Sequence, residues 1–286
     1  MTVLPEINPE KETKKITQFL KSVQKQTGLN RVVLGLSGGV DSYTVLKLLK
    51  KSYSKNNIFV VYLPYEAGFF SFLNDQTKTI ISLIKQEKIP EENFILISLK
   101  EIGEKIFNQL KTINKKGWEK LICEIKKCFT CPNANYLNKI RAGNVLARLR
   151  MILLFDIAKK VNGLVCGTEN KSEKLLGYFT RFGDAASDIE PIINYYKTQV
   201  YRLAKHLKVP EIIIKTSPSA NLWENQTDEE ELGFTYKEAD QVLYIFLEKR
   251  KTLNQIKKLG FKNTEKIIKR YKDNLFKQKT PYYLRK

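Results

Sequence analysis

Two short, uninterrupted apolar segments near the start of the chain constrain its fold more than any other feature. RVVLGL spans residues 31–36 and IFVVYL spans residues 58–63, and neither alternates between apolar and polar residues. Strands buried on both faces of a parallel sheet have this composition. Between them, apolar side chains recur at helical spacing, at Val45, Leu46, Leu48 and Leu49. The pattern predicts a strand, a crossover helix and a second, parallel strand.

The same two patterns alternate further along the chain. We predict a helix over residues 74–88, a third strand over residues 94–98, a long helix near residues 137–161 and a fourth strand over residues 163–168. Strands that alternate with helices indicate a parallel sheet with helices on both faces. The predicted fold class is therefore α/β, in three layers, with a helical C-terminal extension.

We expect a single domain that spans the whole chain, residues 1–286. An N-terminal helix lies within residues 1–30, the α/β core occupies residues 31–210, and residues 211–286 form the helical C-terminal part. Residues 113–136 fit no strand pattern and are interpreted as an insertion, either a helical hairpin or an ordered loop.

The composition is strongly basic, with 50 Lys and Arg residues against 30 Asp and Glu residues and a net charge of +20. This charge favours anionic partners such as nucleotides or RNA. The lysines are dispersed among abundant Ile and Asn, which a background bias in composition also produces. No apolar stretch approaches the ~20 residues that span a bilayer. Because a signal segment is also absent and four cysteines make no disulfide framework, we expect a cytoplasmic protein without a membrane partner.

The sequence Ser-Gly-Gly-Val-Asp-Ser at residues 37–42 follows the first predicted strand and opens the first crossover helix. Parallel sheets bind ligands at this end of their strands. Glycines let the backbone approach phosphate oxygens, and the free N–H groups of a helix start attract a polyanion. The hydroxyls of Ser37 and Ser42 can bind phosphate oxygens, and Asp41 offers a hard oxygen to Mg²⁺. The loop is neither a Walker A sequence nor a GxGxxG fingerprint, which disfavours transfer of the γ-phosphate.

This hexapeptide resembles the signature of the PP-loop ATP pyrophosphatases, which adenylate a carboxylate or carbonyl oxygen and release pyrophosphate. Further segments match the motifs of one branch of that superfamily in order and spacing: residues 144–151, 167–173, 178–184, 196–200 and 218–233. The chain thus resembles the ammonia-dependent NAD synthetases over most of residues 10–281. The resemblance implies an adenine nucleotide alpha hydrolase-like fold, in which the C-terminal part completes the site.

The reaction implied by this resemblance is the amidation of nicotinic acid adenine dinucleotide (deamido-NAD) with ammonia, at the cost of ATP, giving NAD, AMP and pyrophosphate through an adenylated intermediate. A carboxylate is a poor electrophile until AMP turns its oxygen into a leaving group. By resemblance, Asp41 and Glu173 hold Mg²⁺, and Lys197 contacts the ATP phosphates and is catalytic. The positions assigned to ATP are Gly35, Leu36, Ser37, Gly38, Gly39, Val40, Asp41, Ser42, Thr168, Lys197 and Ser219.

The resemblance places deamido-NAD on Arg150, Arg181, Asp188, Phe276 and Lys277. Ammonia is mostly ammonium at neutral pH, so an acid near the adenylate should accept a proton before attack. Asp184 is the catalytic candidate for this step.

The resemblance also implies a homodimer, and the helix near residues 137–161 offers it an apolar stripe that is equally compatible with packing on the sheet: Leu146, Leu149, Ile152 and Leu153. About 30 residues before the first strand leave no room for an amidohydrolase domain, so free ammonia is expected as the nitrogen source. A separate glutaminase subunit stays an open alternative.

Cys128 and Cys131 form a CxxC pair that the NAD synthetase resemblance does not require. PP-loop enzymes that thiolate tRNA also combine this phosphate loop with cysteines and a basic surface, so tRNA thiolation is the alternative function. No separate RNA-binding module is evident, which disfavours a nucleic acid partner. A structural role of the CxxC pair is as compatible with the sequence as a redox role or a role in binding a metal cluster. Residues 64–70 also depart from the polar pattern expected there, and no adenine contact is assigned.

Overall fold

The centre of the fold is a parallel sheet of four strands in the order β3, β2, β1, β4. The computed structural model describes residues 3–65, 75–111, 136–218, 227–279, 281, 282 and 284. The strands are β1 (Arg31–Gly35), β2 (Ile58–Tyr62), β3 (Phe94–Leu96) and β4 (Gly163–Cys166). In β1, Val33 pairs with Phe59 of β2 on one side and with Val165 of β4 on the other. The predicted strands are confirmed, although β3 and β4 end two residues earlier than predicted.

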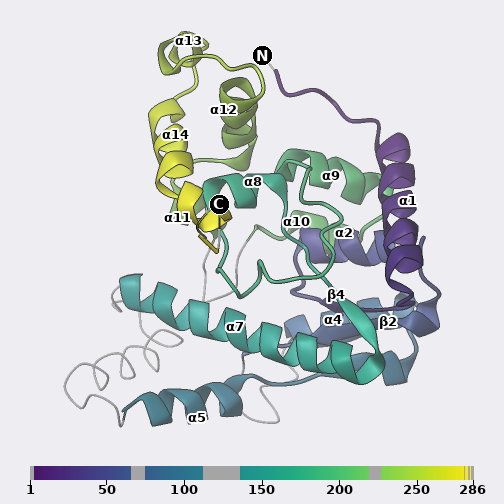
Figure 1. The fold of residues 1–286 in the computed structure, drawn as a ribbon. Coiled ribbons are helices and arrows are strands. Elements are labelled where there is room, and N and C mark those ends of the chain that lie inside the picture. The colour runs from purple at the N-terminus through teal and green to yellow at the C-terminus, as the bar shows by residue number, and fades with distance from the viewer. Residues whose placement is uncertain are drawn as a thin grey trace.

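Helices cover both faces of this sheet (Figure 1). The helices on one face include α1 (Pro9–Thr27), α2 (Val40–Leu49), α4 (Asp75–Gln86) and α9 (Lys197–His206). On the opposite face α7 (Tyr136–Val161) packs on the sheet, and α5 (Lys100–Lys111) packs against α7. Short 3₁₀ helices, η1 (Lys55–Asn57) and η2 (Glu91–Asn93), lead into β2 and β3. The predicted three-layer α/β fold is thereby confirmed.

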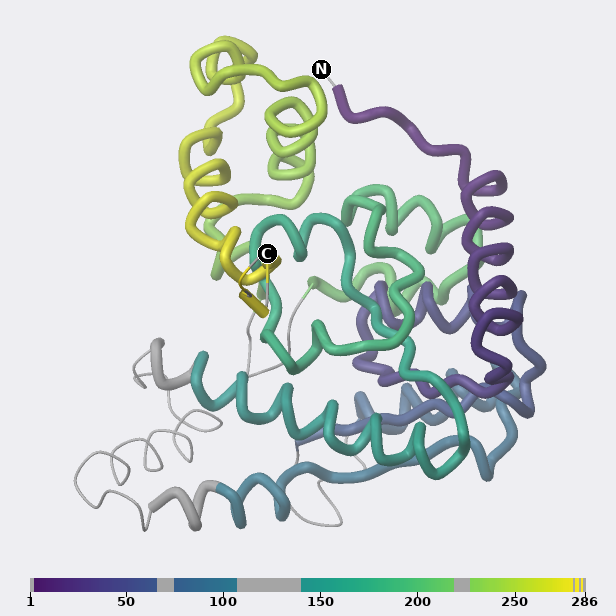
Figure 2. Tube along the Cα trace, viewed as in Figure 1, coloured from purple at the N-terminus to yellow at the C-terminus, as the bar shows by residue number. Residues whose placement is uncertain are grey.

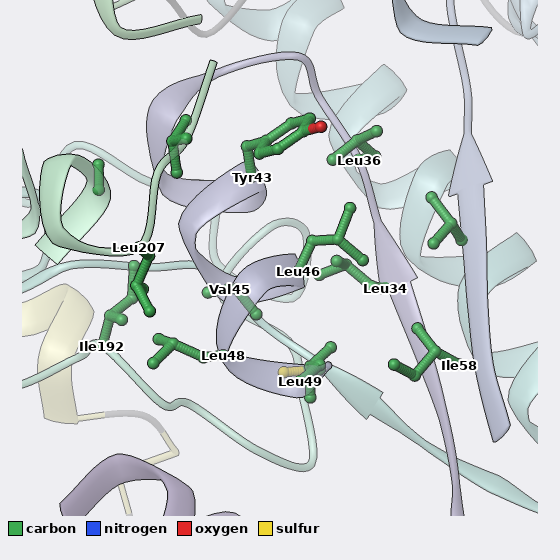
Figure 3. Close-up of a cluster of buried hydrophobic side chains, with 14 of the residues drawn as sticks. Leu34, Leu36, Tyr43, Val45, Leu46, Leu48, Leu49, Ile58, Ile192 and Leu207 are labelled. Atoms are coloured by element: carbon green, nitrogen blue, oxygen red, sulfur yellow. The ribbon is translucent and has the colours of Figure 1, made fainter. Parts of the chain in front are cut away.

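The two sides of β1 show why the sequence forms these layers. Val32 and Leu34 belong to the core under α1, α2 and α9, whereas Val33 belongs to the core under α7. Successive side chains of a strand point to opposite faces, so an uninterrupted apolar run supplies both cores. Figure 3 shows Leu34 facing Leu46 of α2 within the first of them.

Most of the apolar stripe predicted for α7 packs inside this chain. Leu146 and Leu149 are buried, and Leu153 packs against the core on the sheet, whereas Ile152 is 63% exposed. The stripe therefore serves mainly the internal core, which is the alternative that its pattern left open.

Beyond residue 210 every regular element that the structure describes is helical. The elements are α10 (Glu211–Lys215), α11 (Asp228–Leu232), α12 (Tyr236–Leu247), α13 (Leu253–Lys257), α14 (Thr264–Asp273) and the 3₁₀ helix η3 (Leu275–Lys279). The apolar residues of α11, α12, α13 and α14 share a core with Leu176 of α8 (Lys171–Leu176) and with Tyr196. Figure 2 shows this yellow-green part of the chain folding back onto the teal segment around α8. The helical C-terminal extension is confirmed, while the single-domain division stays a prediction.

Within the described ranges, no helix combines the length and the apolar character that crossing a membrane requires. Several predicted features lie outside those ranges. They are residues 113–135 of the predicted insertion, which contain Cys123, Cys128 and Cys131, and the residue Ser219 that was assigned to ATP.

Candidate active site

The loop between β1 and α2 is closed on itself by two serine hydroxyls. The Oγ atoms of Ser37 and Ser42 lie 3.1 Å apart, Ser37 Oγ accepts from the N–H of Gly39 at 3.2 Å, and Ser42 Oγ donates to the Gly39 carbonyl at 3.0 Å. Gly38 has φ +85°, a conformation that a side chain would strain. Gly39 is the N-cap of α2 and provides no side-chain cap. The first N–H groups of α2 thus lie beside two hydroxyls, as a phosphate site requires.

Three of the residues assigned to ATP also contribute to packing or backbone hydrogen bonding in the core. Leu36 and Val40 are buried, and the N–H of Leu36 donates to the Val61 carbonyl at 2.8 Å. A Cβ atom at Gly35 would lie 2.9 Å from Leu154 Cδ1, so this glycine lets α7 approach β1. Only the backbone of these residues is left to face a nucleotide.

Lys197, at the start of α9, joins the two predicted magnesium ligands. Its Nζ lies 2.5 Å from Asp41 Oδ2 and 3.0 Å from Glu173 Oε1, and only 3% of its side-chain surface is exposed. Burial opposes the charge of Lys197, but Asp41 and Glu173 raise its pKa well above its ordinary value. Burial raises the pKa of Glu173 to about 8, although Lys197 lowers it. Two carboxyl groups therefore share one ammonium group.

Asn170 is a residue of this site that our sequence reasoning missed. Its Nδ2 donates to Asp41 Oδ1 at 3.1 Å, and its Oδ1 accepts from the N–H of Glu173 at 3.0 Å, which forms a capping box at the start of α8. The sequence signal was present, because Asn170 precedes Glu173 at the spacing of a capping box.

Tyr236 and Asp228 extend the site from the C-terminal helices, and both were also missed. Lys197 Nζ lies 5.2 Å from the centre of the Tyr236 ring, and the Tyr236 hydroxyl donates to Asp228 Oδ2 at 3.0 Å. Burial raises the pKa of Asp228, whereas Lys197 lowers it. No local sequence signal places these residues beside Lys197.

A second acidic group lies where β4 ends. Glu190 accepts hydrogen bonds from Ser187 Oγ at 2.7 Å and from the N–H of Glu169 at 3.2 Å. A Cβ atom at Gly167 would lie 1.9 Å from Glu190 Oε1, so the glycine makes room for this carboxylate. Burial raises the pKa of Glu169 to about 8 and that of Glu190 to about 7. The half-buried Thr168, assigned to ATP, lies between Gly167 and Glu169 in the chain.

The C-terminal tail reaches the residues assigned to the second substrate. Lys277 Nζ donates to the carbonyls of Gly177 at 2.5 Å and Phe179 at 2.9 Å. The guanidinium of Arg181 lies 5.2 Å from the centre of the Phe276 ring. Arg181, Phe276 and Lys277, which are distant in sequence, are thus brought together.

Asp184 and Arg150 flank this group. Asp184 Oδ1 accepts from the N–H of Thr180 at 2.9 Å, and part of its side chain is open to solvent. The surrounding protein raises the pKa of Asp184, whereas the Thr180 hydrogen bonds lower it. Arg150 Nε donates to the Leu63 carbonyl at 3.3 Å. Burial lowers the pKa of Arg150, and the nearby Asp184 raises it.

Asp188 makes a different contact from the other residues assigned to deamido-NAD. Its Oδ2 accepts from the N–H of Val165 in β4 at 2.8 Å. One of its oxygens therefore holds the backbone of β4 at the edge of the sheet.

The donor set fits a magnesium ion that is shared with phosphate. Among the described residues, no group of three or more His, Cys, Asp and Glu side chains is arranged to hold a metal. Mg²⁺ usually takes one or two carboxylates and completes its shell with water and substrate phosphates. Asp41 and Glu173, brought to the same ammonium group beside the phosphate loop, meet that requirement.

Comparisons with known proteins give one family. The family model of NAD synthase matches residues 12–281. A relative from Fusobacterium nucleatum subsp. nucleatum, described as an NH(3)-dependent NAD(+) synthetase, is 36% identical over 278 residues, covering 96% of this chain and 96% of the relative. The solved structure of an NMN synthetase from Francisella tularensis matches with a TM-score of 0.75 and 28% identity, over 98% of this chain and 99% of that chain.

A second solved structure is an NH3-dependent NAD synthetase from Campylobacter jejuni, with a TM-score of 0.72 and 28% identity over 98% of this chain and 100% of that chain. The family model, the curated relative and both structures cover nearly the whole chain. The matched part includes the phosphate loop and the cluster of Asp41, Glu173 and Lys197. The chain belongs to the NAD synthase family.

Proposed function

We propose that this protein amidates deamido-NAD with ammonia, using ATP, and that the cluster of Asp41, Glu173 and Lys197 is its catalytic centre. The observation that carries the proposal is the buried Lys197, held at 2.5 Å and 3.0 Å by two acids beside an uncapped helix start. A fixed cation and a phosphate loop at one place are what cleavage at the α-phosphate requires.

The triphosphate of ATP binds at the Ser37–Ser42 loop, where N–H groups and hydroxyls point to its oxygens. Asp41 and Glu173 would hold Mg²⁺, which would supply positive charge to the phosphates. Lys197 stabilises the departing pyrophosphate, because its position at the first residue of α9 is fixed by the surrounding protein.

The carboxylate of deamido-NAD attacks the α-phosphorus and expels pyrophosphate, and Arg150, Arg181, Asp188, Phe276 and Lys277 bind the dinucleotide. Asp184 then takes a proton from ammonium, and the free ammonia attacks the activated carbonyl carbon and displaces AMP. Solvent reaches Asp184, as delivery of ammonium requires. Thr168 and Ser219 complete the set that binds ATP. The homodimer and the cytoplasmic location belong to the same proposal and rest on the sequence.

The comparisons favour this function over tRNA thiolation, since the family and its relatives are NAD synthetases. The Francisella relative is described as an NMN synthetase, so the acceptor has to be tested as well.

Purified protein is mixed with ATP, Mg²⁺ and ammonium, with either deamido-NAD or the corresponding mononucleotide acid, and formation of amide and AMP is measured. We expect turnover with the dinucleotide and with ammonium in place of glutamine. Preference for the mononucleotide would overturn the acceptor, and thionucleoside formation on tRNA without NAD would overturn the function.

Asp41→Asn tests the centre itself. The variant keeps the shape of the side chain but loses the charge that Mg²⁺ and Lys197 require, so release of pyrophosphate and AMP should fall to background while the circular dichroism spectrum is unchanged. Retained activity would place the metal on other residues.

A further inference from the structure

Helix α12 of the C-terminal part carries one carboxylate that contacts the neighbours of the proposed catalytic residues. Asp240 is fully buried, and no step of the proposed reaction uses it. Its Oδ1 accepts from Ser172 Oγ at 2.5 Å, and its Oδ2 accepts from the N–H of Thr198 at 2.9 Å and from Thr198 Oγ1 at 2.7 Å. Three donors therefore converge on a single buried acid.

These donors lie directly beside the residues of the centre. Ser172 precedes Glu173 in α8, and Thr198 follows Lys197 in α9. Ser172 Oγ also accepts from the N–H of Lys197 at 2.8 Å, so its hydroxyl links the backbone of Lys197 to Asp240. Asp240 thus ties together the first turns of two helices that carry the proposed metal ligand and the proposed catalytic lysine.

We propose that Asp240 is a positioning residue, which sets the separation of Lys197 and Glu173 by fixing the starts of α8 and α9 from α12. The proposal rests on the function proposed for Lys197 and Glu173. It also assigns the C-terminal helices a role in catalysis that is separate from the role of the tail residues Phe276 and Lys277.

The chemistry of the three donors explains why the residue is an acid. A carboxylate accepts hydrogen bonds at both oxygens, whereas an asparagine would turn an NH₂ group toward either Ser172 or Thr198. Turned toward Thr198, the NH₂ group faces the Thr198 N–H, which cannot accept; turned toward Ser172, it leaves the Ser172 hydroxyl without the oxygen to which it donates. Either orientation leaves a buried donor without its partner, at a substantial cost in free energy. The N–H of Thr198 belongs to the first turn of α9, where a negative charge is also favoured by the helix dipole.

Gln241, the next residue of α12, provides a matched control. It is also buried, and its Oε1 accepts from the N–H groups of Val3 at 2.7 Å and Leu4 at 2.6 Å, outside the catalytic centre. Gln241→Met and Asp240→Asn each remove buried acceptor capacity from the same helix. Thermal unfolding reports the damage to the fold in both variants, and kcat and the KM for ATP report the damage to the site.

We expect Asp240→Asn to lower kcat by at least tenfold and to raise the KM for ATP, while Gln241→Met changes both by less than twofold at a similar loss of unfolding temperature. Thr198→Val, which removes one hydroxyl donor and keeps the shape, should lower kcat by a smaller factor and serves if Asp240→Asn does not fold. Unchanged kcat and KM in the folded Asp240 or Thr198 variants would overturn the proposal.

A double-mutant cycle on the affinity for ATP separates this proposal from the proposed function. If Asp240 acts through Lys197, adding Asp240→Asn to Lys197→Met should weaken ATP binding by less than twofold beyond Lys197→Met alone. Additive losses in calorimetry would mean that Asp240 acts elsewhere, although Lys197 keeps its role. Full activity of Lys197→Met would instead overturn the proposed function, together with the positioning role that rests on it.

Discussion

Glu169 has surroundings that oppose its negative charge. Its Oε1 is buried and has no hydrogen-bond partner within the described part of the chain, and Glu190, Glu173 and Asp184 lie near enough to repel it. Burial is the main cause that raises the pKa of Glu169 from 4.5 to about 8, and the neighbouring acids add to it. At neutral pH the folded protein therefore holds a proton at Glu169 that the unfolded chain releases.

This difference predicts a pH-dependent stability. The contribution of the proton on Glu169 is fully present below pH 4.5 and is lost as the pH rises through about 8, because the folded state must then ionise a buried acid. Glu169→Gln keeps the shape without the ionisation. Its free energy of unfolding in urea, relative to the natural chain, should rise by about 1 kcal/mol per pH unit between about pH 6 and about pH 8. Glu91→Gln, at an exposed position, is the control, and parallel curves for all three proteins would contradict the assignment.

Asp184 is tested by separating its role in chemistry from its role in binding. Asp184→Asn can still accept the hydrogen bond from Thr180 N–H, but it cannot take a proton from ammonium. Turnover with ammonium should fall by about a hundredfold or more, as for loss of a general base, while the affinity for ATP in calorimetry stays unchanged. Equal losses in both measurements would remove Asp184 from the proton-transfer step.

At the scale of elements, the sequence predicts what is determined locally. The runs that became β1 and β2 are apolar throughout, and the loop that follows β1 carries its glycines in the sequence itself. Ligand binding at the carboxyl end of β1 can be predicted from the alternation of strands and helices. Asp41 and Glu173 could be assigned to one site with Lys197 only by resemblance to a family, and Tyr236 was missed, because the three residues reach Lys197 from three different helices. Asp240 has no local signal at all, since its donors are 68 and 42 residues away.

We expect a substitution in the 3₁₀ helix η3 to change the KM for one substrate only. Lys277 holds the Gly177 and Phe179 carbonyls and thereby keeps Phe276 beside Arg181. Lys277→Met should raise the KM for deamido-NAD by about tenfold and leave the KM for ATP unchanged, because the phosphate loop lies on other elements. Lys279→Met, at an exposed position of the same element, is the matched control. A rise of both KM values would show that η3 supports the whole site rather than the dinucleotide side.

On the scale of the molecule, the segment before α1 joins the C-terminal helices to the α/β core. The N–H groups of Val3 and Leu4 donate to Gln241 of α12, and the Pro5 carbonyl accepts from Gln199 Nε2 of α9 at 3.2 Å. Arg202 of α9 pairs with Glu6 at 2.5 Å, with 40% of the Arg202 side-chain surface and 72% of the Glu6 side-chain surface exposed. An exposed ion pair contributes little, so the buried contacts of this segment dominate its stabilising effect.

Leu4 is the side chain that anchors this segment, since it is 6% exposed and belongs to the core of α12 and α14. Leu4→Ala should lower the free energy of unfolding by about 2 to 3 kcal/mol, from lost burial and the cavity left behind. Because Leu4 lies in a different core from the one beneath the phosphate loop, kcat should stay within about twofold at a temperature where the variant is folded. Ile212→Ala, at a side chain that is 56% exposed, should change stability by less than about 0.5 kcal/mol. If Leu4→Ala lowers kcat as strongly as Asp240→Asn, the two cores act as one unit, and the N-terminal segment contributes to the geometry of the site as well as to stability.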